Sequence, residues 1–434
     1  MSEKKLLIKN IASLGVVQIV NYIFPLITIP YISRIIGPTG LGTINYITAF
    51  VAYFTLIVGY GFDLTATRKI AYNPTSIRNR RLVFSQVMNA RFLLFIGSTI
   101  VFIVCIFSFD NFRDNLLLAI LTYINVVSVL LSPQYIFQGL QYLSLYGFVN
   151  LARGVINTIL IFLLIKQPDD YIIYAAIGIF LNLLNSIFFI VFAWNKFNLK
   201  FSWFSIKSSV KLLISERYIF FSSVIFSLYT STNIVILGIY EKPDKIAYYT
   251  VAVGFINIVQ SVINIPLSTS LFPFLGNSFS KSVETGINQL KKILPIVFYL
   301  TFFCGIGLLI LAPLIIKIIY GHKFLNAIVC VRILAFLPLI SSLASLLGVQ
   351  TMLNLKMDKE FIAITFRGAI ISIILNFILG YYFSYIGTTY SYLITEIYII
   401  IALMLKLKSK KMDLIDITFF KPKEVLSVLK TLRR

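Results

Sequence analysis

Long apolar runs follow one another along almost the whole chain, separated by short segments in which polar and charged residues gather. Most runs extend over about 18–28 residues, the length of an α-helix that crosses a hydrocarbon layer about 30 Å thick. The pattern predicts an all-α integral membrane protein with about twelve transmembrane helices. The expected spans are 6–32, 42–66, 82–109, 116–140, 144–165, 171–194, 218–239, 246–275, 293–316, 327–350, 361–383 and 388–405.

The chain divides near its middle, where aromatic and basic residues alternate. Residues 196–217 include Phe197, Lys200 and Trp203, a pattern typical of an amphipathic segment that lies on the membrane surface. The predicted parts are an N-terminal six-helix bundle (1–195), a cytoplasmic amphipathic linker (196–217), a C-terminal six-helix bundle (218–405) and a basic cytoplasmic tail (406–434).

Short motifs recur in the same order in the two predicted bundles. Arg153-Gly154 in the fifth span matches Arg367-Gly368 in the eleventh, and Gly139-Leu140-Gln141 at the end of the fourth matches Gly348-Val349-Gln350 at the end of the tenth. Two halves with the same number of spans and the same orientation predict a parallel repeat about an axis normal to the membrane.

Composition excludes an ordinary soluble protein. Of the 434 residues, 59% are hydrophobic and only 12% are charged, whereas soluble domains carry about 25% charged residues. The net charge is +22, but 27 of the 38 Lys and Arg residues fall on one side of the predicted spans and seven on the other. Because cationic loops resist translocation, this asymmetry predicts cytoplasmic N- and C-termini and explains the charge without nucleic-acid binding.

The sequence contains no Walker-type loop, Gly-x-Ser-x-Gly elbow or His-Glu-x-x-His helix. Cys105, Cys304 and Cys330 fall in apolar spans without Cys-x-x-Cys spacing, and His322 is the only histidine. We therefore expect no catalytic residues, no metal and no cofactor. The outer loops are also too short for the active site of a membrane polymerase, which argues against an enzyme.

Four arginines lie inside predicted spans: Arg91, Arg153, Arg332 and Arg367. A charge at the membrane centre costs about 2.5–3.5 kcal/mol on insertion scales, so such residues usually face a bundle interior or a wet cavity. Arg91, Arg153 and Arg367 share a depth of ~9–14 Å from the predicted cytoplasmic ends. Because guanidinium groups bind phosphate oxygens through paired hydrogen bonds, we predict that these three form an anion site.

Other roles for these arginines stay open at this point. Each side chain can extend to lipid phosphates or cap a neighbouring helix, and Arg332, nearer the outer face, is expected to anchor its span. Two acids, Asp63 and Glu396, are candidates for taking up a coupling proton or cation. Asp63 can instead form a salt bridge with Arg68 or Lys69 at a helix end, and the expected partners of Glu396 are the cavity arginines.

Three segments resemble motifs of a known family. Residues 33–42 read Ser-Arg-Ile-Ile-Gly-Pro-Thr-Gly-Leu-Gly, similar to the Ser-Arg-x-Leu-Gly-Pro-x-Gly-x-Gly turn of polysaccharide exporters. Residues 133–141 resemble the family's Pro-x-Trp-x-x-Gln-Gly-Leu-Glu run, with Tyr135 replacing tryptophan and Gln141 replacing glutamate, and Phe272-Pro273 resembles its Phe-Pro ending of the eighth span. The motif residues of the first turn are Arg34, Gly37, Pro38, Gly40 and Gly42.

The chain thus resembles the Wzx-type O-antigen flippases of the multidrug/oligosaccharidyl-lipid/polysaccharide exporter superfamily, over about residues 5–405. The resemblance implies two six-helix bundles around a central cationic cavity. It implies translocation, by alternating access, of undecaprenyl-diphosphate-linked oligosaccharide repeat units to the periplasmic leaflet of the bacterial cytoplasmic membrane. From their shared depth and the internal repeat, and not from the resemblance, we expect Arg91, Arg153 and Arg367 to contact the diphosphate. Membrane lipids, a polysaccharide polymerase and a chain-length regulator are the expected partners.

Other functional classes are kept as alternatives. A cation-coupled multidrug exporter of the same superfamily would need acids in its cavity, whereas here arginines outnumber acids within the spans. A polysaccharide polymerase is disfavoured by the short outer loops. A non-transporting scaffold for glycan assembly is compatible with the sequence.

Overall fold

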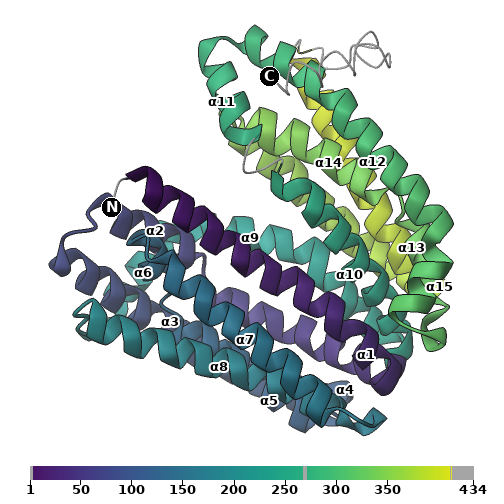
Figure 1. Cartoon of the computed structure of the whole chain (residues 1–434), viewed down its shortest axis with the longest axis horizontal. Coiled ribbons are helices and arrows are strands. Elements are labelled where there is room, and N and C mark those ends of the chain that lie inside the picture. Colours follow the sequence, from purple (N-terminus) through teal and green to yellow (C-terminus); the bar gives the residue numbers. More distant parts are fainter. Residues whose placement is uncertain (1–2, 267–270, 411, 413–434) are drawn as a thin grey trace. The chain divides into compact units, whose positions relative to one another are not determined.

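The computed structural model describes residues 3–266, 271–410 and 412, which form helices and loops without a strand. The chain divides into two compact units, Met1–Ser227 (unit 1) and Leu228–Arg434 (unit 2), and within each of them helices run side by side (Figure 1). The helices of unit 1 are α1 (Glu3–Gly59), α2 (Phe62–Tyr72), α3 (Ile77–Ser108), α4 (Asp110–Arg113), α5 (Leu116–Leu131), α6 (Gln134–Gly139), α7 (Leu143–Leu164), the 3-10 turn η1 (Pro168–Asp170) and α8 (Tyr171–Lys196). Helix α9 (Ile206–Tyr240) continues into unit 2, which also contains α10 (Pro243–Pro266), α11 (Phe272–Lys281), α12 (Val283–Ile319), η3 (His322–Phe324), α13 (Ala327–Ile333), α14 (Leu337–Leu347), the π-helical turn η4 (Gly348–Met352) and α15 (Asp358–Ser409).

Nine helical stretches in the described part of the chain are long and apolar enough to cross a membrane. The all-α membrane architecture is therefore confirmed, but the predicted number of twelve spans is not. Helices α1 and α15 are each interrupted by a residue with positive φ, Gly37 (71°) and Ser384 (58°), so each of them covers two predicted spans. The second predicted span also ends earlier than expected, because Tyr60 and Gly61 adopt positive φ and separate α1 from α2.

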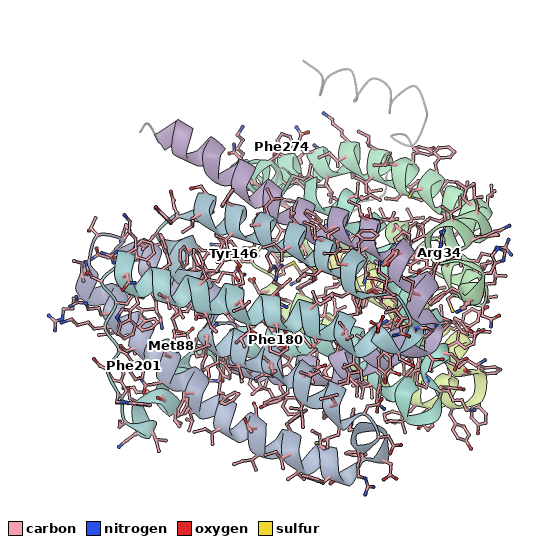
Figure 2. The ribbon with its side chains drawn as sticks, turned by 60° about the horizontal axis from the view of Figure 1, so that its bottom comes forward. Arg34, Met88, Tyr146, Phe180, Phe201 and Phe274 are labelled. Atoms are coloured by element: carbon pink, nitrogen blue, oxygen red, sulfur yellow. The ribbon has the colours of Figure 1, made fainter. Side chains whose placement is uncertain are left out.

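The break in α1 explains the glycines of the turn motif. Gly37 has a left-handed φ that glycine adopts without steric cost. A Cβ at Gly40 would lie 2.8 Å from Ile36 Cγ2 and 3.0 Å from Tyr171 Cβ on α8. Gly42 is buried too, whereas Arg34 is exposed (Figure 2). The motif therefore lets α1 bend and pack closely on α8.

In unit 1, α1, α5, α7 and α8 pack against one another, and α2 packs on α6 near one end. Tyr135 and Phe137 of α6 are fully buried in the apolar core of this end. Gly139 allows the close approach, because a Cβ there would lie 2.8 Å from Ile70 Cβ and 3.1 Å from the carbonyl oxygen of Thr67 on α2. The run 133–141 thus has a packing role in placing α6 on α2.

Residues 199–204, which have no regular secondary structure, form a strap along the N-terminal part of α3. Ser85 Oγ donates to the carbonyl oxygen of Lys200 (3.1 Å) and accepts from the backbone N–H of Ser202 (3.1 Å). Asn89 Nδ2 donates to the carbonyl oxygen of Ser202 (2.9 Å). The strap belongs to the segment 196–217 predicted as a linker, whose first residue, Lys196, ends α8 and whose residues 206–217 begin α9.

In unit 2, a buried polar network joins α9, α10 and α15. Asn233 Oδ1 accepts hydrogen bonds from Asn376 Nδ2 (2.7 Å) and Ser372 Oγ (3.2 Å), while Asn233 Nδ2 donates to Tyr249 Oη (3.2 Å). None of the four side chains is more than 1% exposed. Hydrogen bonds of this kind hold membrane helices together where the hydrophobic effect does not distinguish protein from lipid.

Candidate functional site

Arg91 of α3 is enclosed within unit 1 and is 0% exposed. Its Nη1 donates to the carbonyl oxygens of Ser132 (2.6 Å) and Val129 (3.1 Å), at the C-terminal end of α5. The bond to Ser132 supplies a donor for a carbonyl group just beyond the end of α5, whereas the Val129 carbonyl oxygen also accepts from the backbone N–H of Ser132 at 3.3 Å. The guanidinium carbon lies 5.5 Å from the centre of the Tyr135 ring, so the residue that replaces the family's tryptophan packs on this arginine.

The acid that pairs with Arg91 is Asp63, in the first turn of α2. Asp63 Oδ1 accepts from Arg91 Nη2 at 3.1 Å, whereas Lys69 pairs with Glu216 at 2.5 Å. The expected salt bridge of Asp63 with Arg68 or Lys69 is therefore not formed. Both Nη atoms of Arg91 are occupied by protein groups, so Arg91 is not free to bind an anion in this structure, in contrast to the expected role.

Arg153 lies on α7, half-buried within unit 1. Its Nη1 donates to Oδ1 of Asn182 on α8, and Asn182 Nδ2 donates in turn to Asn125 Oδ1 on α5 at 3.4 Å. The three ion pairs found among the described residues do not include Arg153. The guanidinium thus lies in a membrane-spanning helix beside neutral amides, without a neighbouring carboxylate in the described part of the chain.

Two further features surround Arg153. Tyr146 lies seven residues earlier, at a spacing that places it on the same face of α7, and Asn150 Nδ2 donates to the Tyr146 carbonyl oxygen at 2.8 Å. The sequence places Asn182 and Asn185 three residues apart in an apolar run, where polar side chains hold helices together or line a cavity. It gave no signal for Asn125, because an isolated asparagine in an apolar span does not indicate its neighbours.

Arg367 lies on α15 of unit 2 and is exposed. No ion pair joins it to another described residue. The following Gly368 is buried, and a Cβ there would lie 2.9 Å from Ile399 Cγ1 and 3.8 Å from Thr395 Cγ2. The two segments of α15 therefore approach closely behind Arg367, which leaves the guanidinium on the open side of its helix.

Glu396 also lies on α15 and is 8% exposed. The expectation that arginines pair with it is wrong for the described residues, because the ion pairs found there do not include Glu396. Arg332, expected to anchor its span, is exposed on α13. Among the residues that the structure describes, no group of three His, Cys, Asp or Glu side chains is close enough to hold a metal ion.

These features define a multi-pass membrane protein whose spans carry arginines and the buried acid Glu396. A model of the family described as "Polysaccharide biosynthesis protein" matches residues 7–279, and the chain belongs to this family. The family resemblance inferred from the turn motif is thereby confirmed.

Curated relatives agree with this assignment over most of their length. The chain is 26% identical over 405 residues to a protein of Escherichia coli (strain K12) named "Putative O-antigen transporter", covering 93% of this chain and 97% of that protein. A protein of the same name from Shigella dysenteriae is 26% identical over 407 residues, covering 92% of this chain and all of the other.

Solved structures show the same fold at low sequence identity. The lipid II flippase MurJ in an inward closed conformation superimposes with a TM-score of 0.69 at 18% identity, covering 96% of this chain and 91% of MurJ. An inward-facing multidrug resistance transporter of the MATE family in the MOP superfamily gives a TM-score of 0.64 at 13% identity, covering 93% and 99%. The fold is therefore that of this superfamily of membrane transporters.

Proposed function

We propose that the protein is a flippase for an undecaprenyl-diphosphate-linked oligosaccharide repeat unit, of an O-antigen or a similar surface polysaccharide. It would carry this lipid from the cytoplasmic to the periplasmic leaflet of the bacterial cytoplasmic membrane, with both termini in the cytoplasm. Membership of a polysaccharide biosynthesis family, relatives named as O-antigen transporters and a fold shared with a lipid II flippase support the proposal.

One structural observation carries the proposal. Arg153 is a guanidinium in a membrane-spanning helix whose hydrogen-bond partner is the neutral amide of Asn182. A cation away from bulk water is costly without an opposite charge, so this position favours an anion that arrives from outside the protein. A diphosphate offers several oxygens to the planar fork of an arginine.

Arg367 is proposed as a second phosphate contact, supplied from unit 2. Arg367 is the arginine of the second Arg-Gly motif, as Arg153 is of the first. Its side chain is exposed and has no ion-pair partner among the described residues. Arg91 is reassigned as a positioning residue, because it fixes the end of α5. The polyprenyl tail remains in lipid during alternating access, and the substrate is moved without chemical change.

Glu396 is proposed as the acid that couples transport to an ion gradient. Glu396 is only 8% exposed and lies within a membrane-spanning helix, where a carboxylate without a cation is costly. Uptake of a proton or a monovalent cation removes that cost, so the occupancy of this side chain responds to the gradient. Asp63, already paired with Arg91, is the less suitable of the two acids.

The proposal is tested by the export of lipid-linked repeat units in cells that depend on this protein. The double variant Arg153→Gln, Arg367→Gln should accumulate repeat units on the inner leaflet. Each of the two lost charged hydrogen-bonding contacts, worth about 1.5–3 kcal/mol, lowers the affinity for the substrate roughly 10- to 150-fold. The matched control is Arg113→Gln, because Arg113 is an exposed arginine paired with Asp110 outside the apolar core of the spans.

Two results would count against the proposal in different ways. Undiminished export by the double variant would show that the phosphate site is elsewhere. Efflux of cationic dyes by the wild-type protein, without any change in glycan export when the gene is deleted, would instead indicate the multidrug exporter considered above.

A further inference from the structure

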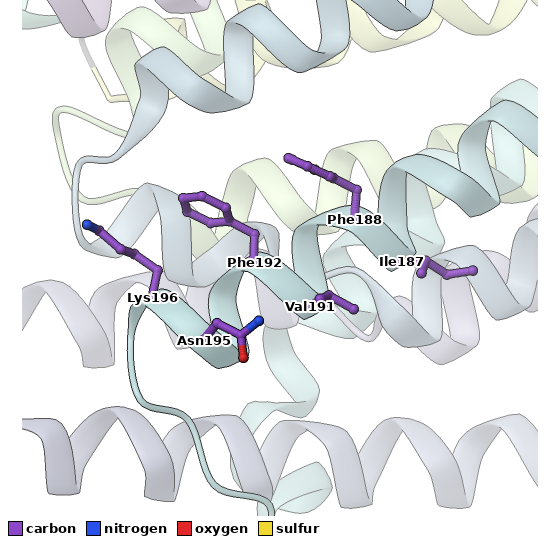
Figure 3. Close-up of a pocket in the computed structure, with 6 residues that line it drawn as sticks. All are labelled: Ile187, Phe188, Val191, Phe192, Asn195 and Lys196. Carbon is purple, nitrogen blue, oxygen red and sulfur yellow. The ribbon is translucent and has the colours of Figure 1, made fainter.

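A hollow of about 650 Å³ lies along the outer side of α8, near the end of that helix. It is lined by two adjacent columns of side chains with a spacing of four residues. Phe188, Phe192 and Lys196 project to the same side of the helix, as Figure 3 shows. The second column consists of Ile187, Val191 and Asn195. Each column is apolar over two turns and polar at its last position.

The apolar part of the hollow is accessible. Ile187, Phe188 and Val191 are 39%, 43% and 53% exposed, although α8 packs on α5, α7 and α1 along its other sides. Because α8 is long and apolar enough to cross a membrane, this exposed strip faces hydrocarbon chains. The hollow extends about 13 Å along the helix axis, from Ile187 to Lys196.

The polar end of the hollow lies at the basic end of unit 1. Lys196 is the last residue of α8, and the carbonyl oxygen of Asn198 just beyond it accepts from Arg81 Nε at 2.7 Å. Arg78 and Arg80 precede Arg81 at the start of α3. The charge distribution of the loops predicts that this end faces the cytoplasm.

The charges of the side chains that line the hollow determine which lipid headgroup it can bind. The ion pairs found among the described residues do not include Lys196, so its ammonium group has no carboxylate partner there. No acidic side chain lines the hollow to hold the ammonium of a zwitterionic headgroup. A lysine ammonium and the Asn195 amide both donate to phosphate oxygens, and clustered basic residues at the cytoplasmic surface attract anionic lipids.

We propose that this hollow is a binding site for an anionic phospholipid of the cytoplasmic leaflet. The phosphate accepts hydrogen bonds from Lys196 and Asn195, and one acyl chain lies between the Phe188–Phe192 and Ile187–Val191 columns. The site is separate from the arginines assigned to the substrate, and it does not depend on the proposed transport function.

Native mass spectrometry of the purified full-length protein tests the site. The protein is equilibrated with equal amounts of phosphatidylglycerol and phosphatidylcholine carrying the same acyl chains. Wild-type protein should retain phosphatidylglycerol preferentially. Lys196→Gln should lower its retention about fivefold, the effect of the ~1 kcal/mol that one lysine contributes near an anionic surface. Lys200→Gln, which removes an exposed lysine four residues away but outside the hollow, should leave retention unchanged.

A second variant separates the groove from general surface charge. Val191→Trp fills the apolar part at an exposed position and should reduce retention of both lipids. The proposal is overturned if wild-type protein retains the two lipids equally, or if Lys200→Gln lowers retention as much as Lys196→Gln. Displacement of phosphatidylglycerol by equimolar undecaprenyl phosphate would also overturn it, because the groove would then hold the lipid part of a substrate.

Discussion

Asn182 Oδ1 on α8 accepts a hydrogen bond from Arg153 Nη1 on α7, so a neutral amide holds the guanidinium that we assign to the substrate diphosphate. The neutrality of this partner matters. A carboxylate at the same position would compensate the charge of Arg153 permanently and compete with the phosphate of a substrate.

Replacing Asn182 by aspartate should therefore impair export more than replacing it by alanine. Asn182→Ala removes the positioning hydrogen bond, worth about 0.6–1.7 kcal/mol in a membrane protein, but leaves the cation available. Asn182→Asp supplies an internal counter-ion. Export of lipid-linked repeat units at matched protein levels is the measurement. Equal activity of the two variants would show that Arg153 does not bind an anion during transport.

The Arg91–Asp63 pair predicts a stability defect rather than a loss of substrate contact. Arg91→Gln leaves the Ser132 carbonyl group without its charged donor, and one such orphaned group costs about 1–3 kcal/mol. The Val129 carbonyl group loses the same donor but keeps the backbone N–H of Ser132. Thermal unfolding of the protein in detergent should shift to lower temperature. Arg113→Gln, at an exposed pair, should change stability by less than ~1 kcal/mol. If Arg91→Gln instead had a normal melting temperature but no transport, Arg91 would have to be assigned to the substrate site.

Glu396→Gln should abolish the coupling of transport to an ion gradient without impairing folding. The neutral amide is nearly isosteric with the carboxyl group and removes the cost of a charge, so the melting temperature should not fall. Transport in proteoliposomes should no longer respond to an imposed proton or sodium gradient. Glu360→Gln, at the start of the same helix, is the matched control. A gradient response that survives in Glu396→Gln would eliminate this acid as the coupling residue.

The polar network of unit 2 should contribute to the stability of the fold and not to substrate binding. Asn233→Ala removes three hydrogen bonds, to Asn376, Ser372 and Tyr249, each worth about 0.6–1.7 kcal/mol in a membrane bundle. Ser222→Ala on the same helix removes one exposed bond to the carbonyl oxygen four residues earlier and should have little effect. Urea or thermal unfolding of purified protein compares them. Equal melting temperatures would show that the network is not a source of stability.

The class of fold was accessible from sequence because a membrane imposes a simple length rule. Each apolar run had to be a helix of about 20 residues, and the glycine of the first turn indicated the bend found at Gly37. The helix count was less accessible. The boundary predicted between residues 383 and 388 coincides with the positive φ of Ser384, but α15 continues on both sides of this single residue, so hydropathy does not reveal whether a helix ends or only kinks.

The site was only partly accessible for a different reason. Arg153 was found because a charge in an apolar run is conspicuous and its motif recurs. The surroundings of Arg91 were missed, because its carbonyl partners lie 38 and 41 residues away in the chain. These carbonyl groups are available only because α5 ends at Leu131, two residues before Pro133. A pairing that depends on where another helix stops has no local signature.

The strap along α3 has a mechanical consequence. Ser85 and Asn89 bind the strap backbone at Lys200 and Ser202, and α9 begins four residues after Ser202. The connection between α8 and α9 is therefore fixed to α3 by these hydrogen bonds, close to the residue at which α9 begins. We therefore expect a tilt of α3 to move the residues that lead into α9, the helix in which the chain passes from unit 1 into unit 2.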